Sequence, residues 1–235
     1  MAPARIATRE EWLKARLDLL EQEKAFTRQR DQLNRKRREL PMVAVDKDYV
    51  FEGPDGKETL ADLFGPCSQL IVQHFMYGKG WSEGCPSCSF WADGFDGTTI
   101  HMRHRDASFV AASNAPLDEI EAYKQRMGWR FKWVSSYGTD FNRDYHVTFT
   151  KEEMEAGPVY YNYKQTSFPV EEAPGISIFY KDDKGGVFHT YSCYARGLDM
   201  LNTAYHYIDL LPKGRDEDGL PYTMSWLRRH DQYED

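Results

Sequence analysis

The chain has 235 residues, of which 41% are hydrophobic and 29% charged, and its net charge is −7 at pH 7. This composition excludes disordered, collagen-like and coiled-coil chains, and it predicts a globular protein with one main domain. The negative charge argues against a nucleic-acid partner, because a general nucleic-acid binder needs a broad basic surface.

Residues 8–40 are predicted to form one long helix that ends before Pro41. Thr8 and Glu11 have the spacing of a capping box, in which each side chain accepts a hydrogen bond from the other residue's backbone amide. A column of apolar residues recurs at every seventh position: Trp12, Leu19, Phe26, Leu33 and Leu40. We expect this narrow stripe to dock into a groove of the same domain or of a second copy. Residues 1–41 would then be a helical arm that supports a homodimer.

Strands and helices are predicted to alternate over residues 42–212, which is typical of a parallel α/β core. The predicted strands are 42–51, 69–76, 107–113, 131–135, 174–180 and 187–193. The predicted helices are 59–64, 85–93, 116–127 and 198–211. Residues 136–173 interrupt the alternation and are expected to be an insertion with short strands. Residues 213–235 are predicted to be a charged tail with one helical turn that anchors Trp226 and Leu227.

Cys85 and Cys88 form a C-x-x-C motif directly after a predicted buried strand and at the start of a predicted helix. This spacing can bring the two sulfur atoms within bonding reach. The free amides and the dipole of the helix start stabilise a thiolate at the first cysteine. Pro86 suits the first helical turn because it has no amide hydrogen to leave unpaired. The pattern predicts a redox dithiol in which Cys85 attacks and Cys88 resolves.

The order of these elements resembles the thioredoxin superfamily, in which a cis-proline enters a hairpin beside the C-x-x-C helix. The resemblance implies an α/β thioredoxin-like fold, a central mixed sheet flanked by helices. It also implies that Pro174 borders the dithiol and helps to bind substrate. Several motifs resemble an uncharacterised bacterial family of thioredoxin-like proteins described as predicted dithiol–disulfide oxidoreductases. They are His74–Met76, Trp81–Ser89, Arg126–Trp129, Asp140–Asn142, His189–Tyr191 and Arg196–Asp199.

The motif departs from thioredoxin itself, in which a tryptophan immediately precedes the first cysteine. Here Gly84 has that position, and Trp81 lies four residues before Cys85. We expect Trp81 to contribute to substrate binding. The insertion 136–173 is long enough to cover the site, which favours a small thiol or disulfide over a protein as substrate. No cofactor is expected.

A metal site is one alternative to the redox dithiol. Cys85, Cys88, His101 and His104 nearly reproduce a zinc-finger spacing, although the last gap is two residues where a finger has three to five. Two glycines also interrupt the helix that a finger requires. Zinc or copper binding by a non-enzymatic module therefore stays open.

A thiol peroxidase that resembles the peroxiredoxins is the other alternative. Those enzymes have a Thr or Ser three residues before the reactive cysteine, a nearby proline and an arginine that stabilises the thiolate. Ser82 has the first of these positions, and Gly78 stands where the proline belongs. The arginine would be one of Arg126, Arg143 and Arg196.

The expected location is the cytoplasm, without a membrane partner. The first eleven residues lack the apolar core of a signal peptide, and no apolar stretch approaches the ~20 residues that a bilayer requires. Four cysteines are too few for a disulfide scaffold. In a reducing compartment, a closely spaced cysteine pair is more often catalytic or metal-binding than structural.

Overall fold

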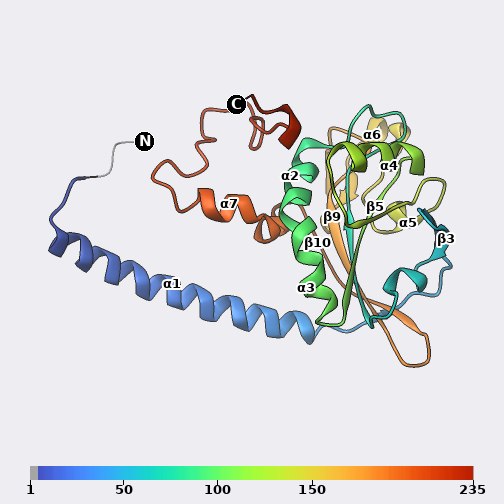
Figure 1. The fold of residues 1–235 in the computed structure, drawn as a ribbon, viewed down its shortest axis with the longest axis horizontal. Coiled ribbons are helices and arrows are strands. Elements are labelled where there is room, and N and C mark those ends of the chain that lie inside the picture. The colour runs from blue at the N-terminus through green and yellow to red at the C-terminus, as the bar shows by residue number, and fades with distance from the viewer. Residues whose placement is uncertain (1–4, 235) are drawn as a thin grey trace.

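A computed structural model describes residues 5–234, and its centre is a mixed sheet of eight strands (Figure 1). The strands are β1 (Val43–Ala44), β2 (Val50–Gly53), β3 (Gly56–Thr59), β4 (Gln69–His74), β5 (Ala107–Ser113), β6 (Lys132–Ser135), β9 (Gly175–Lys181) and β10 (Val187–Tyr194). Their order across the sheet is β1-β10-β9-β4-β5-β6-β2-β3. β4, β5 and β6 are parallel to one another, and the other strands run antiparallel to their neighbours.

Helices lie on both faces of this sheet. The α-helices of the described chain are α1 (Arg9–Arg38), α2 (Pro86–Phe95), α3 (Thr99–Arg103), α4 (Leu117–Arg126), α5 (Phe141–Asp144), α6 (Lys151–Ala156) and α7 (Thr203–Ile208). Short 3-10 segments are η1 (Asp62–Phe64), η2 (Asp96–Thr98), η3 (Ala195–Leu201) and η4 (His230–Gln232). Buried residues of α2 and α4 pack on one face of β5 and β6, and those of η1 and α5 pack on the other.

The central strand β4 is almost fully enclosed, as its apolar run predicts. Leu70 and Val72 are fully buried in the cluster formed with η1 and α5. Phe75, one residue beyond the strand, packs with Trp133 in an aromatic cluster beneath α2 and α4, with ring centroids 4.4 Å apart. The carboxyl end of β4 is therefore fixed from both faces of the sheet, and this end leads into the cysteine loop.

The predicted fold is confirmed by this topology. β4, α2, β5, α4, β9 and β10 follow one another along the chain, and the sheet order β10-β9-β4-β5 combines parallel β4–β5 with antiparallel β9–β10. This is the thioredoxin-like arrangement, with β6 and the β2–β3 hairpin added at one edge and β1 at the other. Parallel neighbours require the crossover helices that α2 and α4 provide.

The long first helix begins at the predicted capping box, where the Thr8 amide donates to the Glu11 carboxylate at 2.8 Å and the Glu11 amide donates to Thr8 Oγ1 at 3.2 Å. Helix α1 then extends away from the domain, and none of its residues is buried (Figure 1). The prediction that the apolar stripe of α1 docks onto its own domain is therefore wrong. Its apolar column remains 46–64% exposed: Trp12, Leu19, Phe26, Leu33 and Leu40. Docking onto a second copy stays a prediction.

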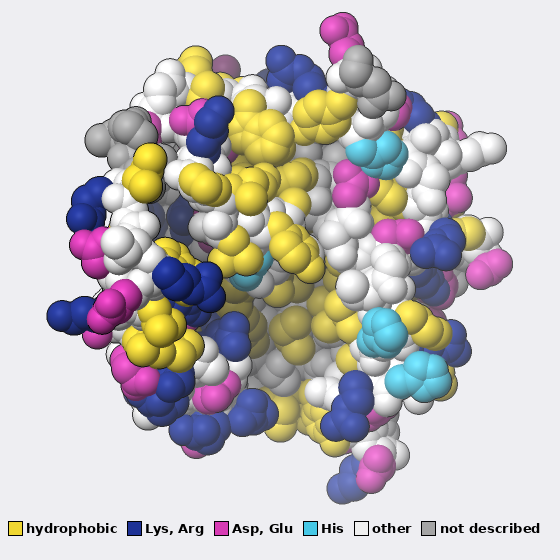
Figure 2. Space-filling model, turned by 60° about the vertical axis from the view of Figure 1, so that its left-hand side comes forward, with side chains coloured by type: hydrophobic (Ala, Val, Ile, Leu, Met, Phe, Trp, Pro, Cys, Tyr) yellow, Lys and Arg dark blue, Asp and Glu magenta, His cyan; other side chains and the backbone are white. Residues whose placement is uncertain are grey.

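Hydrophobic side chains gather around a hollow on the side of the molecule from which α1 extends (Figure 2). The exposed apolar residues of the carboxyl-terminal part include Met200, Tyr207 and Leu210. Although α1 is long, no helix within residues 5–234 is apolar enough over a sufficient length to cross a membrane.

Three predicted elements differ from the structure. The strand expected over 42–51 is two strands, because β1 pairs with β10 whereas β2 pairs with β3 and β6. The helix expected over 198–211 is divided at Asn202, whose side-chain oxygen accepts a hydrogen bond from the Tyr205 amide at 3.4 Å and so caps α7. The helix expected over 85–93 continues through η2 and α3 to Arg103.

The insertion 136–173 contains α5, α6 and a small hairpin of β7 (Val159–Tyr161) and β8 (Lys164–Thr166), so the short strands expected there are present. The hairpin packs against the end of β10, where Tyr161 and Tyr194 have ring centroids 5.6 Å apart. The Tyr161 hydroxyl also donates to the Pro174 carbonyl at 2.7 Å. The insertion is thereby attached to the same end of the sheet as the cysteine loop.

Candidate active site

The C-x-x-C motif lies where the loop after β4 meets α2, as the sequence predicts. The Cys85 amide donates to the Met76 carbonyl at 3.0 Å, and the Cys85 carbonyl accepts the Ser89 amide at 3.0 Å as α2 begins. Pro86 is the first helical residue. The Met76 amide donates to Cys88 Sγ at 3.4 Å. Both cysteines are thus attached to the backbone just beyond the carboxyl end of β4.

The two free thiols differ in exposure and acidity. Cys85 is partly buried, whereas Cys88 is only 1% exposed. The adjoining Cys88 thiol and the amides of Ser87 and Cys88 favour the charged form of the Cys85 sulfur more than burial disfavours it, so the pKa of Cys85 is lowered to about 7. Burial, together with the nearby Cys85 sulfur, raises the pKa of Cys88. At pH 7, about half of Cys85 is therefore present as the thiolate, and Cys88 holds its proton.

This difference predicts a pH profile for alkylation of the native, reduced protein. We expect the rate at Cys85 to rise roughly tenfold between pH 6 and pH 8 and then to level off, because the reactive thiolate fraction saturates above its pKa. Cys88 should stay unmodified. The measurement is iodoacetamide labelling followed by peptide mass spectrometry, with glutathione as the ordinary-thiol control. A Cys85 rate that follows the glutathione profile through pH 9 would contradict the assignment.

Gly84 leaves no space for a side chain before the attacking cysteine. A Cβ atom at this position would lie 2.7 Å from Phe75 Cε1 and 2.7 Å from Tyr123 Cε1. The tryptophan that precedes the cysteine in thioredoxin is therefore sterically excluded here. Trp81 instead lies in the preceding loop, where its amide donates to the Gly78 carbonyl at 3.1 Å and its partly buried ring packs against the aromatic cluster.

The carboxyl-terminal segment lies beside the start of α2 (Figure 1) and contacts the cysteine loop, which the sequence does not predict. Arg229 Nη2 donates to the Gly84 carbonyl at 2.6 Å, its Nε donates to the Tyr123 hydroxyl at 3.1 Å, and its Nη1 lies 2.7 Å from Glu83 Oε2. Arg126 pairs with the same Glu83 and, at 2.6 Å, with Asp231. The helical turn expected before Arg229 is a non-helical turn in which the Leu227 amide donates to the Met224 carbonyl at 3.1 Å, and Leu227 is 3% exposed. The residues after it form a clamp, residues 229–232, on the loop.

We expect Arg229→Ala to lower the free energy of unfolding by about 1–3 kcal/mol, because the Gly84 carbonyl and the Tyr123 hydroxyl each lose a charged donor. Arg130→Ala is the matched control. Arg130 is 80% exposed and pairs with Asp96 at 3.3 Å, so its loss should change the unfolding free energy by less than about 1 kcal/mol. Urea unfolding measures both effects. Equal losses in the two variants would show that the clamp is not a stabilising contact.

A buried acid also lies beside this loop. Glu172 is 3% exposed and accepts hydrogen bonds from Asn114 Nδ2 at 2.9 Å and from the Thr148 hydroxyl at 2.7 Å. A Cβ atom at Gly78 would lie 3.3 Å from Glu172 Cγ, so the acid packs against the start of the loop. Burial raises the pKa of Glu172 to about 7. Sequence reasoning missed this residue, because a glutamate in a polar insertion gives no sign of burial.

Pro174 has the expected place in the fold. His74 is opposite Gly175 in the β4–β9 register, so Pro174 lies just beyond the carboxyl end of β4, beside the loop that carries the cysteines. The sequence left the isomer of the Pro174 peptide bond open, and residues 5–234 contain no cis peptide bond. Contact between substrate and Pro174 or Trp81 stays a prediction.

The zinc-finger arrangement is not formed. The two cysteines lie at the start of the helical segment 86–103, whereas His101 and His104 lie at its other end, on or just after α3. Both histidines are exposed: His101 lies on α3, and His104 lies in the turn that follows it. In the described part of the chain, no group of three or more His, Cys, Asp or Glu side chains is placed to hold a metal ion.

The peroxidase arrangement is present only in part. Ser82 is exposed. Arg143 pairs with Glu153 at 2.7 Å within the insertion, and Arg196 is 76% exposed on η3. Of the three predicted arginines only Arg126 contacts the cysteine loop, through Glu83. The guanidinium that contacts the residue before Cys85 belongs to Arg229, which was not among them.

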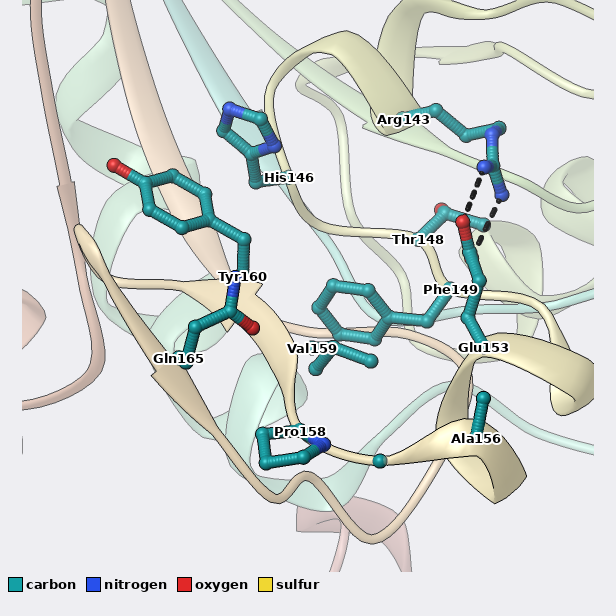
Figure 3. A pocket seen from close by; sticks show the side chains of 11 residues that line it. Arg143, His146, Thr148, Phe149, Glu153, Ala156, Pro158, Val159, Tyr160 and Gln165 are labelled. Carbon is teal, nitrogen blue, oxygen red and sulfur yellow. Dashed lines mark hydrogen bonds and ion pairs between the residues drawn. The ribbon is translucent and has the colours of Figure 1, made fainter.

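The insertion contains a separate cavity of about 440 Å³ (Figure 3). Arg143 and Glu153 form a two-bond ion pair at its rim, and His146 and Tyr160 line it from the opposite side. Burial lowers the pKa of His146. The lining residues all belong to 143–165 and include neither cysteine, so this cavity is not part of the dithiol site.

Comparisons with known proteins give a family and a set of distant structures. Residues 1–233 match the family described as "Bacterial protein of unknown function (DUF899)". No curated protein matches the chain. Among solved structures, a mutant of PrxQ from Xylella fastidiosa is 11% identical, with 71% of this chain and 95% of that chain covered and a TM-score of 0.45.

Two further structures are similar at the same level. Peroxidoxin BcpB from Mycobacterium tuberculosis is 12% identical, with 72% of this chain and 97% of that chain covered and a TM-score of 0.47. A proposed thiol:disulfide interchange protein DsbE from Chlorobium tepidum is 13% identical, with 70% of this chain and 97% of that chain covered and a TM-score of 0.42. No activity is inferred from similarities of this size.

Proposed function

The chain belongs to the DUF899 family of bacterial proteins, and we propose that it is a thiol–disulfide oxidoreductase that works through Cys85 and Cys88. One observation carries this proposal. At the start of α2, a partly exposed cysteine whose pKa is lowered to about 7 is followed three residues later by a buried cysteine whose pKa is raised. An attacking thiolate and a protected resolving thiol need this asymmetry.

The proposed reaction has two displacement steps. The Cys85 thiolate attacks one sulfur of a substrate disulfide, forms a mixed disulfide and releases the first substrate thiolate. Cys88 then loses its proton and attacks the Cys85 sulfur, which releases the second substrate thiolate and leaves a Cys85–Cys88 disulfide. The substrate gains two electrons and takes up two protons. The dithiol loses two electrons and two protons as it becomes a disulfide. An external thiol must reduce the protein again before the next turnover.

The surroundings of Cys85 support a small substrate. The clamp and the loop from Gly78 to Gly84 lie next to the cysteine, and Cys85 keeps only part of its surface exposed. We propose that a small thiol or disulfide reaches Cys85 beside Pro174 and Trp81. A folded protein would have to displace residues 229–232 first.

Mixing the reduced protein with bis(2-hydroxyethyl) disulfide tests the proposal. We expect release of two 2-mercaptoethanol molecules per protein and formation of one Cys85–Cys88 disulfide, with a rate at pH 7 above that of free glutathione. A parallel reaction with hydrogen peroxide distinguishes the peroxidase alternative. Rapid sulfenic acid formation at Cys85 together with no reaction toward the disulfide would contradict an oxidoreductase and favour a peroxidase.

A further inference from the structure

An apolar groove lies on the α2 side of the sheet, next to the carboxyl-terminal end of α1. Two cavities of about 370 Å³ and 460 Å³ form it. Ile71 of β4 lines the first cavity and is opposite Ile178 of β9, which lines the second. These two residues pack in one hydrophobic cluster with Tyr191 of β10, so the cavities share an apolar floor. Figure 2 shows hydrophobic side chains around a hollow on the side from which α1 extends.

The walls of the groove are also mostly apolar. Those from the helical segment 86–103 and from η3 include Phe95, Met102, Leu198, Met200 and Leu201. Met200 and Leu201 are 44% and 43% exposed. Arg37 Nη2 lies 3.8 Å from Met200 Sδ, so the end of α1 contacts the wall formed by η3.

The polar side chains of the groove are mostly uncharged. Besides the tyrosines and Trp91, they are Asn34, Gln69, Gln73, Thr98, Thr190 and Thr203. Among the described residues, the charged ones that line the groove are Arg37 and Arg38, both from α1 itself. A surface with few charges that combines aromatic residues, methionines and arginines has the composition of a protein–protein interface core.

Helix α1 begins far from this groove and reaches it only at its last turns. Arg37 and Leu40 line the second cavity, whereas the rest of the helix extends away from the domain (Figure 1). Leu19 and Phe26 are 50% and 64% exposed, and they lie on one face because seven residues make nearly two helical turns. The apolar stripe therefore needs a surface from another molecule.

A second copy of the chain offers such a surface. Residues 9–40 have 10 Lys or Arg and 7 Asp or Glu, whereas residues 41–235 have 19 and 30, so the helix is basic and the domain acidic. These opposite charges favour docking of the helix onto a partner's domain. Because α1 leaves each domain beside the groove, a two-fold axis can place both helices reciprocally. Contacts over residues 12–33, about 32 Å long and 10 Å wide, would bury roughly 1,300 Å² in total, the size of a stable interface.

We propose that the chain forms a homodimer in which the apolar stripe of α1 from each copy lies in the groove of the other copy. Each helix then covers the shared floor of Ile71, Ile178 and Tyr191 in its partner. The proposal does not depend on the redox function, because the dimer contact involves neither cysteine of the C-x-x-C motif.

Sedimentation velocity of the full reduced chain at about 1–100 µM measures the dimer. Leu19→Glu places a charge in the apolar contact and should raise the dimer dissociation constant at least about 100-fold. Leu17→Glu is the matched control, because Leu17 is 51% exposed and lies about 160° around the helix from Leu19. Its dissociation constant should change less than about twofold. A monomer throughout this range, or equal effects of the two substitutions, would overturn the proposal.

A groove variant shows which surface receives the stripe. Met200→Glu/Leu201→Glu changes two exposed side chains, so it should fold and weaken the dimer as strongly as Leu19→Glu. Val50→Glu, on β2 at the other edge of the sheet and 40% exposed, should leave the dimer unchanged. Circular dichroism and Cys85 alkylation confirm that each variant has folded. If the groove variant remained a dimer while Leu19→Glu dissociated, the two stripes would pair with each other, and the groove would not be their binding surface.

Discussion

Replacement of Cys85 by serine is expected to lower disulfide turnover by at least about 1,000-fold, because a serine hydroxyl is not ionised near neutral pH and is a poor nucleophile toward sulfur. Cys88→Ser should leave the first displacement intact and stop the second. The mixed disulfide between substrate and Cys85 would then accumulate, since no thiol remains within reach to resolve it. Intact-protein mass spectrometry after mixing with bis(2-hydroxyethyl) disulfide measures the trapped species.

Cys193→Ser is the matched control for both variants. Cys193 is a free thiol that is 8% exposed, and its Sγ donates to the Gly197 carbonyl at 3.7 Å. Its loss should leave turnover unchanged. If Cys85→Ser retained turnover, or if Cys88→Ser turned over as fast as the unmodified protein, the two-step mechanism would be wrong. Normal turnover in Cys88→Ser would favour a one-cysteine mechanism.

Gly84→Ala is expected to destabilise the fold by about 1–3 kcal/mol and to slow alkylation of Cys85. The added methyl group would lie 2.7 Å from carbon atoms of both Phe75 and Tyr123, and the rings are held by other aromatic neighbours. The loop must therefore shift away from α4. This shift would disturb the hydrogen bond from Arg229 to the Gly84 carbonyl and the position of Cys85.

Gly97→Ala provides the matched comparison, because a Cβ atom at Gly97 has no neighbouring atom within 4 Å. This variant should be as stable as the unmodified protein or slightly more stable, since alanine loses less backbone entropy than glycine on folding into a helical segment. Urea unfolding and Cys85 alkylation are measured on both variants. A Gly84→Ala protein that behaves like Gly97→Ala would show that the close contacts at Gly84 relax without consequence.

The fold could be predicted because the sequence patterns that indicate its helices and strands are local. The apolar run of β4, helix α4 between Pro116 and Gly128, and the strand β9 after Pro174 can each be recognised within about ten residues. The rule of right-handed crossovers limits how they can be connected. The C-x-x-C motif is equally local, since its position at the strand–helix junction already predicts which cysteine is the thiolate.

The remaining features depend on contacts between distant parts of the chain. Arg229 lies 145 residues from Gly84, and the sequence does not indicate which carbonyl its guanidinium binds. The burial of Glu172 likewise depends on packing within the insertion, where Thr148 donates to its carboxylate. The stripe on α1 predicts a contact but not a partner: the helix leaves its own domain, and its apolar residues stay exposed.

The most direct test is the reduction potential of the Cys85–Cys88 pair, measured by equilibration with glutathione redox buffers and thiol mapping by mass spectrometry. We predict a single two-electron transition between about −120 and −270 mV, in which both cysteines become oxidised together into one intramolecular disulfide. Its position within that range would show whether the protein acts as an oxidant or a reductant. The account would be contradicted if no Cys85–Cys88 disulfide formed at any buffer ratio while both thiols remained reactive after unfolding.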